Sequence, residues 1–241
     1  MTPRRDMTSG RMARGLLAAL GCFSLFASGA AAADRAATDW PFLDAYRAQN
    51  ASLPPARHRV VFMGDSITEF WDKAHLQLFA DPAYVNRGIS GQTTPQMLVR
   101  FRQDVINLHP EAVVILAGTN DIAGNTGPAT PEMIEDNLAS MCDLAHAHGI
   151  KVALGLILPV ARYPWAPELK PVPAIATVNA WIVKYAGEHG YAVIDFFTPM
   201  VDESRGLKHA YSEDGVHPNA AGYDVMAGLV HTSLARIVKA D

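Results

Sequence analysis

The chain has 241 residues, of which 49% are apolar and 18% are charged, so it can bury a large core and is predicted to form one compact domain. It carries 20 Lys and Arg against 24 Asp and Glu, for a formal net charge of −4. Nucleic-acid binding depends on clustered Lys and Arg, and the sequence has no basic stripe. This balance argues against a nucleic-acid partner.

The first 33 residues have the order of a secretory signal peptide. Four arginines precede an apolar run over residues 15–26, which passes into a small-residue stretch that ends at Ala33. Ala, Ser and Gly dilute this segment too much for a membrane anchor, which needs about 20 strongly apolar residues. We therefore expect residues 1–33 to be removed and the mature chain to be exported, to the periplasm or outside the cell, without stable membrane insertion.

The two cysteines allow one alternative to simple export. Lipid attachment at Cys22 would anchor the chain, but Ala19 stands where the lipobox of bacterial lipoproteins usually has Leu. Loss of the leader would leave Cys142 as the single cysteine, so no intramolecular disulfide is expected.

An N-terminal arm, residues 34–58, precedes the main domain, residues 59–241, and a short helix is expected over 40–46. Five apolar runs are candidate strands, several with consecutive apolar positions as in strands buried on both faces: 59–63, 84–87, 112–117, 151–158 and 191–197. Caps, first-turn prolines and terminal glycines indicate four helices: 95–108, 131–148, 172–189 and 219–239. The alternation predicts an α/β fold with a parallel sheet covered on both faces.

Residues that could take part in catalysis follow four of these strands. Ser66 follows the first, Gly88 the second, Asn120 the third, and the segment 214–218 comes after the fifth. Loops at the carboxyl ends of parallel strands converge on one crevice, so these residues are expected to meet there.

Ser66 has two interpretations. It could cap the helix that follows Gly-Asp-Ser, or it could be a nucleophile, which requires a base and oxyanion donors. Among nine histidines, His217 has a carboxylate, Asp214, three residues before it and Gly215 to permit a tight turn. Asp214 could hold the imidazole Nδ1 and leave Nε2 for a serine hydroxyl, although it could also serve only as a helix cap.

Gly88 and Asn120 are the candidate oxyanion donors. Gly88 would offer an unobstructed backbone N–H, and Asn120 its amide, although a glycine after a strand is usually a turn and a lone Asn often forms an Asx turn. Ser66, Gly88, Asn120 and the Asp214–His217 pair are each weak indications of an active site alone. Together, each after the appropriate strand, they are a specific one.

These residues resemble the SGNH (GDSL-type) hydrolases of esters, in the family's order and with compatible spacing: 64–68, 86–91, 118–121 and 214–218. The resemblance implies that Ser66 is nucleophile and oxyanion donor, Gly88 and Asn120 are further donors, His217 is the base and Asp214 its partner. It also implies a flavodoxin-like, three-layer α/β/α sandwich of five parallel strands.

The motifs look most like those of platelet-activating-factor acetylhydrolase-type members and bacterial carbohydrate O-acetylesterases. This resemblance implies a small-molecule or saccharide ester with a short, acetyl-type acyl group as substrate. Candidate substrate contacts are Asp65, Trp71, Tyr163 and Trp165, although the aromatic residues could simply pack the loops. The alternative is a lysophospholipase or thioesterase that places a longer acyl chain along the proline-rich loop, residues 158–173.

Two other classes fit the fold less well. A catalytically silent carbohydrate-binding protein would not need all the catalytic side-chain types, and a flavodoxin-like FMN carrier needs a phosphate loop where Asp65 and Glu69 would repel the phosphate. The histidines are scattered, so neither a metal nor another cofactor is expected.

Overall fold

The structure of the protein is a computed structural model that describes residues 38–74 and 77–238. The expected signal peptide and Cys22 lie outside the described residues. The elements named below lie within Pro41–Asp241, the second of two units into which the chain divides.

A five-stranded, all-parallel sheet forms the centre of the second unit, in the order β2-β1-β3-β4-β5. The strands are β1 (Val60–Gly64), β2 (Tyr84–Gly88), β3 (Ala112–Leu116), β4 (Lys151–Gly155) and β5 (Ala192–Ile194). Every residue of β1 and β3 is buried, which is why these strands are apolar at consecutive positions.

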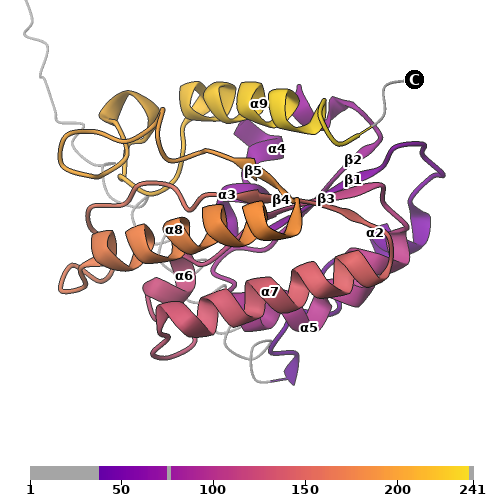
Figure 1. Cartoon of the computed structure of the whole chain (residues 1–241), viewed down its shortest axis with the longest axis horizontal. Helices are drawn as coiled ribbons and strands as arrows, with labels where there is room; N and C mark the ends of the chain where they lie inside the picture. The colour runs from indigo at the N-terminus through magenta and orange to yellow at the C-terminus, as the bar shows by residue number, and fades with distance from the viewer. Residues whose placement is uncertain (1–37, 75–76, 239–241) are drawn as a thin grey trace, which may run out of the picture. The chain divides into compact units, whose positions relative to one another are not determined.

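Helices cover both faces of the sheet (Figure 1). They are α2 (Arg47–Ser52), α3 (Ser66–Glu69), α4 (Trp71–Ala74), α5 (Thr94–Asp104), α6 (Thr119–Ile122), α7 (Pro131–Ala147), α8 (Pro171–His189) and α9 (Ala220–Leu234). Short 3-10 helices occur at η1 (Leu78–Ala80), η2 (Ile106–Leu108) and η3 (His209–Tyr211).

Side chains of β1 alternate between two cores. Val61 and Met63 pack with residues of α5, α7 and α8, whereas Val60 and Phe62 pack with residues of α3, α4 and α9. The predicted α/β/α sandwich with a five-stranded parallel sheet is therefore confirmed.

Two predicted strands and two predicted helices are too long. The fourth strand ends at Gly155 and the fifth at Ile194, where Asp195 Oδ1 accepts hydrogen bonds from the N–H groups of the next turn and leads the chain out of the sheet. The helix expected over 95–108 ends at Asp104, because Val105 has a non-helical backbone, and continues as η2. The helix expected over 219–239 ends at Leu234, and residues 235–237 form turns.

The helix expected over 40–46 is wrong. Residues 40–46 form turns, and the helix of the arm, α2, begins only at Arg47. Phe42 has a φ of 57°, in the left-handed region, which a right-handed helix cannot include. Among the described residues, no helix is long and apolar enough to cross a membrane.

Candidate active site

Ser66 lies where β1 ends and α3 begins. Asp65, not Ser66, is the residue before the helix, and its Oδ1 accepts a hydrogen bond from the Ile67 N–H at 2.9 Å. Ser66 is the first residue of α3, so its own N–H has no acceptor within the helix. The cap is thus supplied by Asp65, and the Ser66 hydroxyl is left for another partner.

That partner is His217. Ser66 Oγ and His217 Nε2 are 2.9 Å apart, although the two residues are 151 positions apart in the sequence. On the other side of the ring, His217 Nδ1 is 2.7 Å from Asp214 Oδ2. With Nδ1–H donated to the carboxylate, Nε2 accepts the serine proton.

A tight turn holds Asp214 in this position. Gly215 has a φ of 80°, and Asp214 Oδ1 accepts backbone N–H groups from Val216 and His217, both at 2.8 Å. Partial burial alone would raise the pKa of Asp214, but the hydrogen bonds from the His217 ring and from these N–H groups outweigh it and hold the pKa at about 2. The carboxylate is therefore charged at neutral pH.

Asn120 lies on α6, after β3, and is buried. Its Oδ1 accepts a hydrogen bond from Asn125 Nδ2 at 3.0 Å, and its Nδ2 donates to the Gln92 carbonyl at 3.0 Å. An amide nitrogen carries two hydrogens, so Nδ2 keeps a second donor.

The position of Gly88 does not fit the expected role. Its N–H already donates to Asn86 Oδ1 at 2.8 Å, and a Cβ at this position would lie 2.2 Å from the Glu69 backbone nitrogen. Glycine is therefore needed here because β2 passes close to α3.

Gly91, in the loop that follows β2, is an alternative candidate for the donor role. It is exposed, with a φ of 77°, and its carbonyl accepts a hydrogen bond from Asn125 Nδ2 at 3.1 Å. Because Asn125 Nδ2 also donates to Asn120 Oδ1, Asn125 links Gly91 to that candidate donor. The sequence alone does not distinguish Gly91 from Gly88, because the positive φ of Gly91 depends on the folded loop.

Three of the four candidate substrate contacts are buried. Asp65 is 1% exposed, and burial raises its pKa to about 7. Trp71 is 1% exposed and packs against Phe62 and Tyr223 in the core. The Tyr163 side chain is fully buried, with its hydroxyl donating to the Thr119 carbonyl at 2.8 Å. These positions correct the expectation that the three residues line the substrate site.

Trp165 is placed differently. It is 49% exposed, and its ring centre lies 6.3 Å from that of His217. Phe70, which is not among the four candidate contacts, has its ring centre 5.6 Å from the same imidazole. The residue beside the site is therefore Phe70 rather than its neighbour Trp71.

A cavity of about 350 Å³ adjoins the site and is lined by Glu213, Asp214, His217, Pro218 and Asn219. Within residues 38–74 and 77–238, no group of three or more His, Cys, Asp or Glu side chains is arranged to hold a metal ion. A serine hydroxyl, an imidazole and a carboxylate in this order can carry out nucleophilic acyl transfer.

Comparison with known proteins agrees with this chemistry. Residues 62–225 match the model of the GDSL-like Lipase/Acylhydrolase family. The chain is 32% identical over 179 residues to Esterase TesA of Pseudomonas aeruginosa, covering 69% of this chain and 82% of that protein. It also resembles the crystal structure of a GDSL-like lipase from Bacteroides thetaiotaomicron, with a TM-score of 0.80, 43% identity, and coverage of 82% of this chain and 99% of that chain. The chain therefore belongs to the GDSL-like lipase/acylhydrolase (SGNH) family and is a carboxylic ester hydrolase.

Proposed function

We propose that the protein hydrolyses short-acyl esters, acetyl esters in particular, through a triad of Ser66, His217 and Asp214. The observation that carries this proposal is the continuous hydrogen-bond chain from Ser66 Oγ to His217 Nε2 at 2.9 Å, and from His217 Nδ1 to Asp214 Oδ2 at 2.7 Å.

In the acylation step, His217 Nε2 takes the proton of Ser66 as Oγ attacks the ester carbonyl carbon. The tetrahedral intermediate collapses when the alkoxide leaving group receives that proton from His217 and departs as the alcohol. In the second half, His217 deprotonates water, which attacks the acyl-enzyme, and Ser66 Oγ recovers a proton. The charged Asp214 stabilises the imidazolium that forms in both halves.

The negative charge of the tetrahedral intermediate requires hydrogen-bond donors. We assign this role to the N–H of Ser66, at the first residue of α3, to the N–H of Gly91, and to the second hydrogen of Asn120 Nδ2. Gly91 replaces Gly88 in this assignment, because the Gly88 N–H donates to Asn86. One such donor typically contributes a factor of about 10² to 10³ in kcat.

The proline-rich loop supports a short acyl group. A long acyl chain needs an open apolar groove, yet Leu158, Val160 and Tyr163 of this loop are buried in the core. The exposed ring of Trp165 instead offers a flat wall beside His217, of the kind on which a sugar ring can stack. An acetylated saccharide fits both the lack of an acyl-chain groove and the exposed Trp165 ring.

Export of the enzyme is part of the proposal. The basic, apolar and small-residue order of residues 1–33 supports cleavage of a leader near Ala33 and a substrate outside the cytoplasm, and lipid attachment at Cys22 is the weaker alternative. The mass of the secreted protein tests this directly, because a cleaved chain lacks the leader and a lipoprotein keeps Cys22 with its lipid.

A substrate panel tests the activity: p-nitrophenyl esters from C2 to C12, acetylated xylo-oligosaccharides and lysophospholipids, each run beside Ser66→Ala. We expect the rate to fall with acyl length and to vanish in the variant. A preference for long chains would favour the lysophospholipase or thioesterase alternative. Activity that survives in Ser66→Ala would indicate another nucleophile, of which Ser90 is the first to examine.

A further inference from the structure

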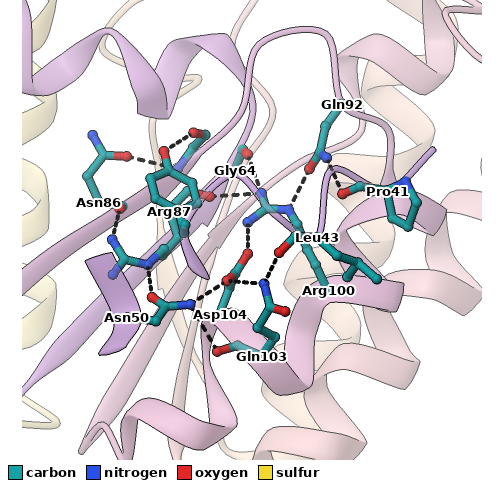
Figure 2. A network of polar contacts seen from close by, with 12 residues as sticks. Pro41, Leu43, Asn50, Gly64, Asn86, Arg87, Gln92, Arg100, Gln103 and Asp104 are labelled. Atoms are coloured by element: carbon teal, nitrogen blue, oxygen red, sulfur yellow. Dashed lines mark hydrogen bonds and ion pairs between the residues drawn. The ribbon is translucent and has the colours of Figure 1, made fainter. Parts of the chain in front are cut away.

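We propose that Gln92 and Arg100 are positioning residues that hold the oxyanion loop, defined as residues 89–93, against the carboxyl ends of β1 and β2. This inference rests on the proposed function, because it assumes that Gly91 and Asn120 are oxyanion donors. Figure 2 shows the network of polar contacts that these two side chains form with neighbouring strands and with the N-terminal arm.

Arg100 joins the two strands that end beside the site. It projects from α5 and is fully buried, and its Nη2 donates to the carbonyls of Gly64 at 3.1 Å and Arg87 at 2.8 Å. Gly64 is the last residue of β1, two positions before Ser66. Arg100 Nη1 donates to Asp104 Oδ2 at 3.1 Å, which gives the buried cation a counter-charge.

Gln92 connects Arg100 to the oxyanion loop. Arg100 Nε donates to Gln92 Oε1 at 2.5 Å, and the Gln92 side chain is buried. The backbone carbonyl of the same residue accepts the hydrogen bond from Asn120 Nδ2 at 3.0 Å. Gln92 also follows Gly91 directly in the chain. The contact between Arg100 and the Gln92 side chain therefore fixes Gln92, which in turn orients the two candidate donors, Gly91 and Asn120.

The other end of the Gln92 amide reaches the N-terminal arm. Its Nε2 donates to the Pro41 carbonyl at 2.9 Å. A second glutamine, Gln103, makes the same kind of contact with the Leu43 carbonyl, but within the described residues its side chain forms no hydrogen bond with Arg100 or with the loop. Among the described residues, Gln103 thus provides a matched comparison, since it contacts the arm and Asp104 without contacting the oxyanion loop.

The chemistry of the network favours a positioning role. A buried ion pair such as Arg100–Asp104 is weak evidence for a contribution to stability, because desolvating both charges offsets their attraction. Arg100, however, directs three of its four hydrogen bonds to backbone carbonyls and to the Gln92 side chain, at the edge where the site is built. An oxyanion hole depends on donors held in place before the reaction, and a misplacement of about 1 Å can lower the rate about 10²-fold.

The test compares Gln92→Met with Gln103→Met in the mature enzyme, using kcat and KM for p-nitrophenyl acetate together with the melting temperature. Both variants lose a donor to an arm carbonyl, but Gln92→Met also removes the acceptor of Arg100 Nε. We expect Gln92→Met to lower kcat about 10- to 100-fold with KM nearly unchanged, and Gln103→Met to keep the wild-type kcat. Equal kcat values in the two variants would overturn the proposal, whatever their melting temperatures.

Gln92→Glu tests rescue, because a carboxylate restores the acceptor for Arg100 while losing the donor to Pro41. We expect its kcat to recover to within about threefold of wild type, and a kcat as low as that of Gln92→Met would contradict the Arg100 contact. If Gln92→Met does not fold, Gln92→Asn keeps an amide but is one methylene shorter, and the same loss of kcat is expected.

Asn120→Ala separates the positioning role of Gln92 from the oxyanion assignment on which it rests. Full turnover in Asn120→Ala would remove the oxyanion assignment itself. Impaired turnover in Asn120→Ala, with normal turnover in the Gln92 variants, would remove only the positioning role.

Discussion

Replacing Asp65 with asparagine should raise the free energy of unfolding, and by more at pH 8 than at pH 5. Asp65 is 1% exposed, and burial raises the pKa of its carboxyl from 3.8 to about 7. Asparagine keeps an Oδ1 that can accept the Ile67 N–H, but it carries no charge to bury.

The magnitude follows from the difference between the two pKa values. Between pH 3.8 and about 7 the folded state binds more protons than the unfolded state, so this carboxyl lowers stability as pH rises. Each pKa unit corresponds to 1.36 kcal/mol, which gives a penalty of about 2 kcal/mol at pH 5 and about 4 kcal/mol at pH 8. Asp65→Asn should recover amounts of this order.

Guanidinium titrations at both pH values measure the effect, because the midpoint and slope give the free energy of unfolding directly. Asp202→Asn is a control for which the expected change in stability has the opposite sign. Hydrogen bonds from the Ser204 hydroxyl and the Gly206 N–H lower the pKa of Asp202, so its replacement should reduce stability above the ordinary pKa of Asp. A stability gain in Asp65→Asn that does not grow from pH 5 to pH 8 would refute the reasoning.

Four further variants test the site and the core. Asn120→Ala should lower kcat by about 10² to 10³ with KM nearly unchanged, and unaltered turnover would remove Asn120 from the mechanism. Gly88→Ala should lower the melting temperature strongly, because the added Cβ would meet the backbone of α3; a wild-type melting curve would contradict that packing. Trp71→Ala should destabilise the fold by about 3 to 5 kcal/mol. Trp165→Ala should instead raise KM for acetylated xylo-oligosaccharides at unchanged stability. Denaturant titrations and kinetics on both variants distinguish these effects.

The sheet could be predicted because its strands are buried on both faces. Val60 to Met63 are apolar at four consecutive positions, and the structure buries all four. Strand ends were less predictable. β5 stops at Ile194 because Asp195 accepts hydrogen bonds from the following turn, although the apolar residues Phe196 and Phe197 continue beyond it in the sequence.

The proposed triad was predictable for a different reason. Asp214 and His217 are three residues apart, so a local turn suffices to join them, and the parallel topology then brings Ser66 to the same edge. The roles expected for Gly88 and Trp71 depended on the folded chain: Gly88 ends β2, where its N–H donates to Asn86 Oδ1, and Trp71 packs in the core, whereas Phe70 lies beside His217.

The Arg100 network lay beyond sequence reasoning. An arginine on an amphipathic helix normally reaches solvent, and its acceptors Gly64 and Arg87 are 36 and 13 positions away. Nothing local in the sequence identifies those carbonyls as its partners.

The central claim is that Ser66 is the nucleophile, and covalent labelling with a fluorophosphonate tests it most directly. Mass spectrometry of the labelled mature enzyme should find one adduct, on the peptide that contains Ser66, and none on Ser66→Ala. The same variant should hydrolyse no p-nitrophenyl acetate above background. An adduct on Ser90, or undiminished hydrolysis by Ser66→Ala, would contradict the account.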